Sequence, residues 1–297
     1  MPLATTRLRP FKQVDVFTTV PFLGNPVAVV LDAADLSTEQ MQRIARWTNL
    51  SETTFVLPPS SPQADYRVRI FTPGSELPFA GHPTIGTAHA LLEAGQIQAH
   101  AGGITQESAI GLVKLRVSAR QDGERVIAFE LPPPAVHALT PAQADPLANL
   151  FPGMLTGEQA PRLVDVGPRW VVVQLPDAGR VLSARPDLAQ IRAVSANAQA
   201  TGVLVFGAYG PGQDAQVEVR AFAPLCGVDE DPVCGSGNGC MAVFIRETGQ
   251  ATRFGQQFMA SQGQVVGRAG QLHIEIAPER IQVGGCAVTC IDGQVRC

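Results

Sequence analysis

The chain is short of positive charge. Of its 297 residues, 22 are Lys or Arg and 26 are Asp or Glu, which gives a formal net charge of −4 at pH 7. Without a basic surface to neutralise phosphates, the protein is not expected to bind nucleic acid. Charged residues make up only 16% of the chain while 45% are hydrophobic, and this composition excludes intrinsic disorder.

Long apolar runs are lacking as well. No run approaches the ~18 apolar residues of a membrane-spanning helix, so no membrane partner is expected. The first ten residues contain no apolar core like that of a signal peptide, and the expected location is the cytoplasm. The six cysteines all fall in the last quarter of the chain without the Cys-x2-Cys spacing of a zinc site. We therefore expect reduced thiols and no structural metal.

Turn-forming residues are plentiful. The chain has 29 Gly and 24 Pro but only 2 Tyr and 2 Trp, and this balance favours many short strands joined by tight turns over a helical bundle. At about 150 residues per domain, the length predicts two domains, which we place at residues 1–125 and 126–297. The short strands expected at 264–267, 272–276 and 281–283 could also return to complete the first domain.

One helix has a complete start signal. Ser37 and Gln40 match the capping-box pattern, so a helix is predicted to begin after Ser37 and to end near Asn49. Its apolar face is predicted to contain Met41, Ile44, Ala45 and Trp47.

An internal repeat frames a candidate site. Residues 81–95 and 235–249 align without a gap, and they are identical at the first position, the last position and two positions between. A Phe-x-Pro turn stands upstream of each copy, so both copies run strand, turn, loop, glycine, helix, glycine. This shared order indicates that the chain is a duplicated unit.

The repeat has a consequence for ligand binding. Each helix that starts at Gly81 or Gly235 exposes unpaired backbone N–H groups and the positive end of its dipole. If the two starts converge, they would bind an anion such as a substrate carboxylate; alternatively, both glycines only permit tight turns. Near these starts, Glu52 precedes an apolar strand. A desolvated carboxyl has a raised pKa and can serve as an acid or base near neutral pH, whereas a solvated Glu52 would only cap a turn.

Four motifs in order resemble those of the PhzF family, named for the phenazine-biosynthesis isomerase, which has the diaminopimelate epimerase-like fold. The resemblance covers nearly the whole chain and implies an α+β fold of two pseudo-symmetric domains, each a curved, mostly antiparallel sheet around a central helix. It also implies an active site between the domains, a homodimer, and catalysis without a cofactor or metal. The motifs are Val14–Thr18 with Pro21–Pro26, Asn49–Thr53, Phe71–Pro73 with Glu76–Pro83, and Glu230–Pro232 with Gly235–Ser236.

The resemblance also implies residue roles. Glu52 matches the family's acid/base glutamate, and His82, Asp231 and Ser236 match the other polar residues of its cleft. The family's reaction is the isomerisation of trans-2,3-dihydro-3-hydroxyanthranilate, in which a proton leaves C3 and returns at C1. We therefore expect a cofactor-independent isomerase acting on a small carboxylate-bearing metabolite. The residues expected to bind the substrate are Ser51, Gly81, Pro83, Gly235 and Gly237.

Two alternatives stay open. Cys234 stands where the diaminopimelate epimerase branch carries one of its two catalytic cysteines, but the matching position in the first repeat is Ala80. A racemase would then have to use Glu52 with Cys234, while an inert, buried thiol is the usual role of a lone cysteine. The other alternative is a PhzF-like protein that binds a partner without catalysis.

Overall fold

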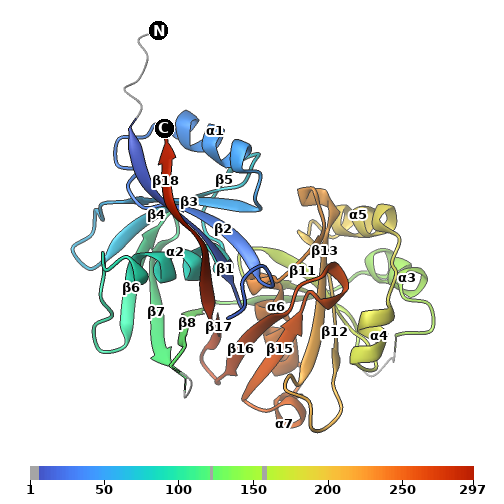
Figure 1. Cartoon of the computed structure of the whole chain (residues 1–297). Coiled ribbons are helices and arrows are strands. Elements are labelled where there is room, and N and C mark those ends of the chain that lie inside the picture. The colour runs from blue at the N-terminus through green and yellow to red at the C-terminus, as the bar shows by residue number, and fades with distance from the viewer. Residues whose placement is uncertain (1–6, 121–122, 156–158) are drawn as a thin grey trace. The chain divides into compact units, whose positions relative to one another are not determined.

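The computed structural model describes residues 7–120, 123–155 and 159–297, which form two compact units. Unit 1 contains the chain up to Phe129 together with Gly284–Cys297, and unit 2 contains Glu130–Val283. The chain thus leaves unit 1 once and returns to it. Its last strand, β18 (Ala287–Arg296), pairs antiparallel with the first strand, β1 (Leu8–Val16), as the red and blue ribbons in Figure 1 show.

Unit 1 is a mostly antiparallel sheet with one central helix. That helix, α2 (Gly81–Glu93), packs against strands β1, β2, β3 and β18 and is buried over most of its length. The other elements that begin in unit 1 are β2 (Asn25–Val30), α1 (Thr38–Thr48), β3 (Glu52–Leu57), β4 (Tyr66–Phe71), β5 (Glu76–Leu77), β6 (Gly103–Ser108), β7 (Gly111–Ala119) and β8 (Arg125–Glu130).

Unit 2 has the same plan. Its central helix, α6 (Gly235–Glu247), packs against strands β10, β11, β12 and β16. The other elements that begin in unit 2 are β9 (Ala135–Ala138), α3 (Pro141–Leu150), β10 (Arg162–Asp165), β11 (Arg169–Gln174), α4 (Ala178–Ser183), α5 (Leu188–Asn197), β12 (Gly202–Ala208), β13 (Val217–Ala223), the 3-10 helix η1 (Pro224–Cys226), β14 (Val228–Asp231), α7 (Ala251–Phe254), β15 (Gln257–Gln262), the 3-10 helix η2 (Gln264–Val266), β16 (Gly270–Ile276) and β17 (Ile281–Gly285).

The strand pairing confirms the duplication predicted from the sequence. In unit 1, β1–β2 is antiparallel, β2–β3 parallel, β3–β4 and β4–β5 antiparallel, β4–β6 parallel and β6–β7 antiparallel. In unit 2, the series β10–β11, β11–β12, β12–β13, β13–β14, β13–β15 and β15–β16 repeats these directions in the same order. The edge pairing of β1 with β18 is matched by that of β10 with β9. Both central helices span 13 residues.

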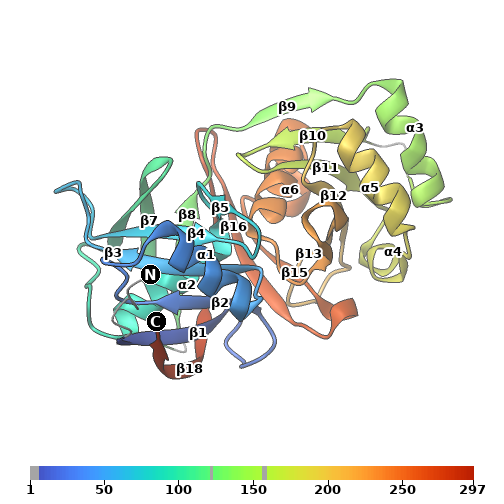
Figure 2. The same cartoon turned by 90° about the horizontal axis from the view of Figure 1, so that it is seen from above.

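The central sheet of unit 2 is covered on both faces because its strands are apolar on both sides. Val203 and Val205 of β12 belong to a core formed with α3, α4 and α5. Leu204, which lies between them in sequence, points to the opposite face and approaches Gly237 of α6. Figure 2 shows α6 on one side of β12 and the three outer helices on the other.

Helix α1 begins as the sequence predicts, with one correction on its apolar face. Ser37 caps the helix, its capping box with Gln40 is formed, and Asn49 ends it in the left-handed conformation at φ 55°. Met41 and Ala45 are buried, whereas the prediction of Trp47 on the same face is wrong, because its side chain is 79% exposed. At 100° per residue, Trp47 lies about 200° around the helix from Ala45 and so faces solvent.

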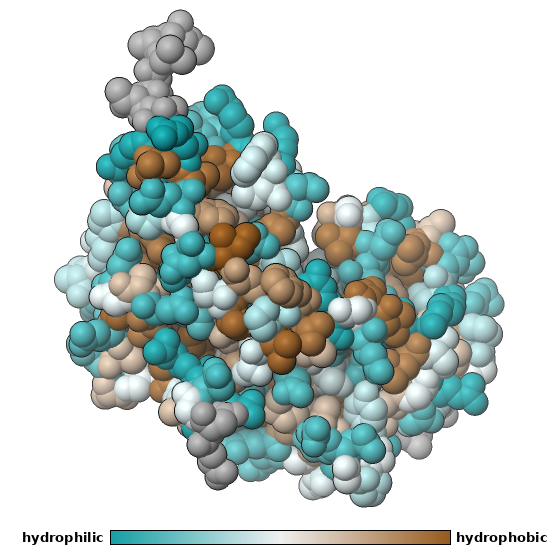
Figure 3. All heavy atoms as spheres, in the orientation of Figure 1, coloured by the Kyte–Doolittle hydropathy of each residue, from teal (hydrophilic) through white to brown (hydrophobic). Residues whose placement is uncertain are grey.

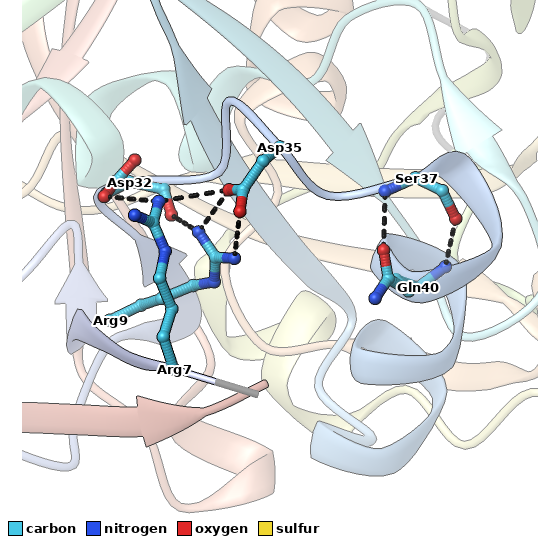
Figure 4. Close-up of polar contacts among 6 residues, drawn as sticks. All are labelled: Arg7, Arg9, Asp32, Asp35, Ser37 and Gln40. Atoms are coloured by element: carbon cyan, nitrogen blue, oxygen red, sulfur yellow. Dashed lines mark hydrogen bonds and ion pairs between the residues drawn. The ribbon is translucent and has the colours of Figure 1, made fainter. Parts of the chain in front are cut away.

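The loop before α1 is held by an ion-pair network, drawn in Figure 4. Arg9 makes two hydrogen bonds to the Asp35 carboxylate, at 2.7 and 3.0 Å, and a third to the Asp32 carbonyl. Arg7 bridges the carboxylates of Asp32 and Asp35. Arg9 of β1 and Arg7, which directly precedes this strand, therefore hold the segment from which α1 begins.

A second correction concerns residues 264–267, which were predicted to form a strand. They contain the 3-10 helix η2, flanked by Gly263 at φ 102° and Gly267 at φ 73°. Two positive-φ glycines make this segment the turn between β15 and β16.

On the face in Figure 3, hydrophobic residues lie in small groups among hydrophilic ones. Among the described residues, no helix has the length and apolar character needed to cross a membrane.

Candidate functional site

The predicted site residues form two groups, one in each unit. We call Ser51, Glu52, Gly81, His82 and Pro83 half-site 1, and Asp231, Cys234, Gly235, Ser236 and Gly237 half-site 2. Each lies where a strand end meets the first turn of the unit's central helix.

Half-site 1 brings together the glutamate and histidine that the sequence singled out. Glu52 is the first residue of β3 and follows the half-buried Ser51, while His82 is the second residue of α2. The two side chains meet at 3.3 Å between Glu52 Oε2 and His82 Nε2. They are only 15% and 7% exposed, respectively, so water screens the pair weakly.

His82 is neutral in this setting. Burial lowers the pKa of His82 to about 3, although a hydrogen bond from its ring to the Pro26 carbonyl opposes that shift. Nε2 faces Glu52, so Nδ1 is the nitrogen that donates to Pro26. The unprotonated Nε2 can act only as an acceptor toward Glu52. When Glu52 is protonated, its carboxyl can therefore donate a hydrogen bond to this ring nitrogen.

Close packing fixes the start of α2. A Cβ at Gly81 would lie 2.6 Å from the ring of Phe129, so only glycine fits there. Thr87 Oγ1 lies 2.7 Å from the Pro83 carbonyl and 2.8 Å from Thr54 Oγ1. These contacts join the first turn of the helix to β3, two residues beyond Glu52.

Half-site 2 is built on the loop between β14 and α6. Asp231 Oδ1 accepts a hydrogen bond from the backbone N–H of Val233 at 3.1 Å. Gln262 of β15 donates to the Asp231 carbonyl at 2.8 Å and accepts from the backbone N–H of Cys234 at 3.0 Å and from Asn238 at 2.8 Å. A single buried amide thus fixes both ends of the loop.

Cys234 caps α6 and contacts the other polar groups of half-site 2. Its sulfur accepts from the backbone N–H of Gly237 at 3.3 Å and lies 3.5 Å from Ser236 Oγ. A Cβ at Gly237 would lie 2.6 Å from Leu204, so this glycine also has a packing role. Burial raises the pKa of the Cys234 thiol, and the nearby Asp231 carboxylate raises it further. A buried thiol that stays protonated supports an inert, structural role for Cys234, which is the usual role of a lone cysteine.

The pKa of the Asp231 carboxyl lies close to neutral pH. Desolvation raises the pKa of Asp231 to about 6, against the opposing effect of hydrogen bonds from the Cys234 thiol and the Val233 N–H. A carboxyl that titrates there can donate or accept a proton under physiological conditions.

Sequence reasoning missed the supporting residues of both half-sites. Thr54, Thr87, Gln262 and Asn238 carry no motif, and their roles come from hydrogen bonds between segments far apart in the sequence. Trp170 of β11, which donates from Nε1 to Ser236 Oγ at 3.1 Å, is read from its apolar strand as an ordinary core residue. Within the described ranges, no group of three or more His, Cys, Asp or Glu side chains is arranged to hold a metal ion.

The chain is similar to known proteins over nearly its full length. The family model PhzC-PhzF, described as phenazine biosynthesis-like protein, matches residues 14–293. The chain is 42% identical over 292 residues to antisense-enhancing sequence 1 of Schizosaccharomyces pombe, covering 96% of this chain and 97% of the relative. It is 37% identical over 284 residues to the trans-2,3-dihydro-3-hydroxyanthranilate isomerase of Pseudomonas fluorescens, covering 93% and 95%.

Solved structures show the same fold. A phenazine biosynthesis protein of the PhzF family from Bacillus anthracis matches with a TM-score of 0.84 and 26% identity, covering 97% of this chain and 99% of that one. A hydroxyproline epimerase from Agrobacterium vitis matches with a TM-score of 0.65 and 16% identity, covering 99% and 94%, and so shares the fold alone. The fold expected from the sequence is confirmed. Since the family model spans both half-sites and relatives across the family are named isomerases, the chain belongs to the PhzC-PhzF family and is an isomerase of that family.

Proposed function

We propose that the protein moves a proton between two carbon atoms of a small carboxylate-bearing metabolite, with Glu52 as both base and acid and without a cofactor. The observation that carries the proposal is the buried contact between Glu52 and the neutral His82. Relatives named trans-2,3-dihydro-3-hydroxyanthranilate isomerase supply the first substrate to test.

In the proposed reaction, Glu52 is the acid/base group, and Ser236 and Asp231 supply hydrogen bonds, as the family resemblance implies. Glu52 takes a proton from one carbon and returns it to another, while His82 Nε2 accepts from the protonated carboxyl. As the C–H bond breaks, negative charge spreads onto the conjugated system of the substrate. The Ser236 hydroxyl and Asp231 in its protonated form would stabilise that charge by hydrogen bonding.

Two helix starts support the choice of a carboxylate substrate. The first N–H groups of an α-helix lack partners within the helix and favour an anion. At α2 the N-cap is Ala80, whose side chain makes no capping hydrogen bond. At α6 the sulfur of Cys234 takes only the N–H of Gly237. We propose that backbone around Ser51, Gly81, Pro83, Gly235 and Gly237 binds the substrate.

Hydrogen exchange tests the proposal. The protein is incubated with trans-2,3-dihydro-3-hydroxyanthranilate in D2O, and deuterium uptake at carbon is followed by NMR. We expect enzyme-dependent uptake that is lost in Glu52→Gln. The matched control is Glu76→Gln, which removes a carboxylate that pairs with Arg69 on the surface of unit 1. Uptake that survives Glu52→Gln would show that another group is the base.

The alternative of an epimerase using Glu52 and Cys234 is less well supported. A thiolate base requires a lowered pKa, whereas burial raises the pKa of Cys234. Incubation with one enantiomer of an amino acid and polarimetry would detect racemisation directly. If no candidate exchanges or racemises, the partner-binding alternative gains.

We also propose a cytoplasmic homodimer, as the family resemblance implies. None of the six cysteines, which all lie in the described part of the chain, forms a disulfide, and this fits a reducing compartment. Light scattering coupled to size-exclusion chromatography would give the mass of the particle, with about twice 31.4 kDa expected.

A further inference from the structure

The chain has two tryptophans in opposite environments. Trp47 on α1 is 79% exposed, whereas Trp170 on β11 is 2% exposed and gives its indole N–H to Ser236. We propose that Trp170 is a positioning residue, which orients the Ser236 hydroxyl so that this hydroxyl donates a hydrogen bond to an oxygen of the substrate. This inference rests on the proposed function for the role of Ser236.

In unit 2, the contact between Trp170 and Ser236 takes the place of the contact between Glu52 and His82 in unit 1. In both units the Phe of the Phe-x-Pro turn pairs across strands with one residue, Thr53 in β3 and Val203 in β12. The preceding residues, Glu52 and Gly202, are the first residues of these strands and hold equivalent positions. Unit 2 therefore has no side chain where unit 1 carries the proposed base.

The parallel strand next to each position carries the compensating change. Val27 pairs with Glu52 in unit 1, and Trp170 pairs with Gly202 in unit 2. A Cβ at Gly202 would lie 2.0 Å from the Phe222 carbonyl oxygen and 2.8 Å from Cζ3 of the Trp170 ring. Glycine at this position therefore accommodates both the backbone of β13 and the indole on the neighbouring strand.

In both units, the second residue of the central helix contacts a side chain from this pair of neighbouring parallel strands. In unit 1 that residue is His82, which contacts Glu52 at 3.3 Å. In unit 2 it is Ser236, which accepts from Trp170 at 3.1 Å. The strand pair thus supplies the proposed base from β3 in unit 1 and a hydrogen-bond donor from β11, the other strand of the pair, in unit 2.

The contact with Trp170 restricts the groups to which the Ser236 hydroxyl can donate its own hydrogen bond. An indole N–H can only donate, so Trp170 occupies one of the two lone pairs of Ser236 Oγ. The other described neighbour is the Cys234 sulfur at 3.5 Å, a weak acceptor that already receives the Gly237 N–H. A carboxylate or carbonyl oxygen of a substrate is a far stronger acceptor for the Ser236 hydroxyl.

A purely structural explanation makes a different prediction. A buried indole needs a hydrogen-bond acceptor, and Ser236 could serve only to satisfy Trp170. In that case Trp170→Phe would lower stability but would leave the reaction of folded protein unchanged. If Trp170 positions Ser236, the loss of the N–H would affect the reaction only while Ser236 is present.

The test is a double-mutant cycle with trans-2,3-dihydro-3-hydroxyanthranilate as substrate. We expect Ser236→Ala to lower kcat/KM by about 100-fold, as for the loss of a hydrogen-bond donor to developing charge. Trp170→Phe should lower kcat/KM by about tenfold in the otherwise unchanged protein, and by less than twofold when Ser236 is already Ala. An equal loss in both backgrounds, or no loss in either, would overturn the positioning role. Trp47→Phe is the matched control and should leave kcat/KM unchanged.

A second measurement needs binding without turnover. The protein has two indole N–H groups, and a spectrum of Trp47→Phe assigns the Trp170 resonance by 1H–15N NMR. We expect Ser236→Ala to shift this resonance, and we expect trans-2,3-dihydro-3-hydroxyanthranilate to shift it when added to Glu52→Gln. If wild-type protein shows no turnover, the proposed function fails. If the ligand binds and the Trp170 resonance does not move, the inference about Trp170 fails instead.

Discussion

The duplicated units contain the same arginine–glutamate pair in two degrees of burial, which allows a matched test of what burial does. In unit 2, Arg220 makes two hydrogen bonds to Glu230, at 2.9 and 2.8 Å, and their side chains are 4% and 10% exposed. In unit 1, Arg69 makes two hydrogen bonds to Glu76, both at 2.7 Å, with side chains 21% and 36% exposed. Each guanidinium also stacks over the Phe two residues later, at 4.9 and 5.1 Å.

We predict that replacement of the buried arginine by methionine is far more destabilising. Arg220→Met leaves the Glu230 carboxylate buried without its partner, and it removes the donor to the carbonyls of Val181 and Ala184. Breaking such a buried pair lowers the free energy of unfolding by about 3–5 kcal/mol. Arg69→Met removes a partly exposed pair, which is worth about 0.2–1 kcal/mol.

Urea denaturation followed by two signals measures the difference. Fluorescence of Trp170 in a Trp47→Phe background reports on unit 2, and far-UV circular dichroism reports on the whole chain. If Arg220→Met and Arg69→Met lower the free energy of unfolding equally, then burial is not what distinguishes the pairs, and the reasoning fails.

Three further predictions concern titration and the thiol. Desolvation raises the folded-state pKa of Asp231 to about 6, above its value in the unfolded chain, so its protonation stabilises the fold at low pH and this stabilisation is lost as pH rises from about 4 to 6. Asp231→Asn should therefore be more stable than wild type at pH 7 but not at pH 4 in urea denaturation, and the reverse order would contradict the shift. The pKa of His82 is lowered to about 3, so its ring resonances should not titrate by NMR between pH 5 and 8; a midpoint within that range would mean that the imidazole is charged. Cys234→Ala should keep turnover within a few-fold and lower stability by about 1 kcal/mol through the lost helix cap, whereas complete loss of turnover would revive the epimerase mechanism.

Local signals explain which parts of the fold the sequence could predict. The limits of α1 follow from Ser37, Gln40 and Asn49, which act within one turn of the helix ends. The repeat was visible because both central helices begin and end with matching residues. By contrast, the face of α1 that is buried depends on where β3 and β4 lie, and periodicity alone placed Trp47 on the wrong side.

The candidate site also combines residues that the sequence could predict with residues that only the structure identifies. Glu52 and His82 stand in motifs, and the structure brings their side chains together within unit 1. Trp170 lies 66 residues before Ser236, and their contact depends on the packing of α6 against β11. No feature of residues 169–174 distinguishes an indole that contacts a polar side chain from one that only fills the core.

The differences between the duplicated units bear on the choice between a two-base racemase and an isomerase with one base. A pair of identical half-sites would carry two acid/base groups, as a two-base racemase requires. Here the position of Glu52 is held by Gly202 in unit 2, and Ala80 in unit 1 stands where unit 2 has Cys234. Each half-site thus lacks the group that would make it equal to the other. This asymmetry fits the proposal that a single carboxyl, Glu52, takes a proton and returns it, rather than a mechanism with two equivalent bases.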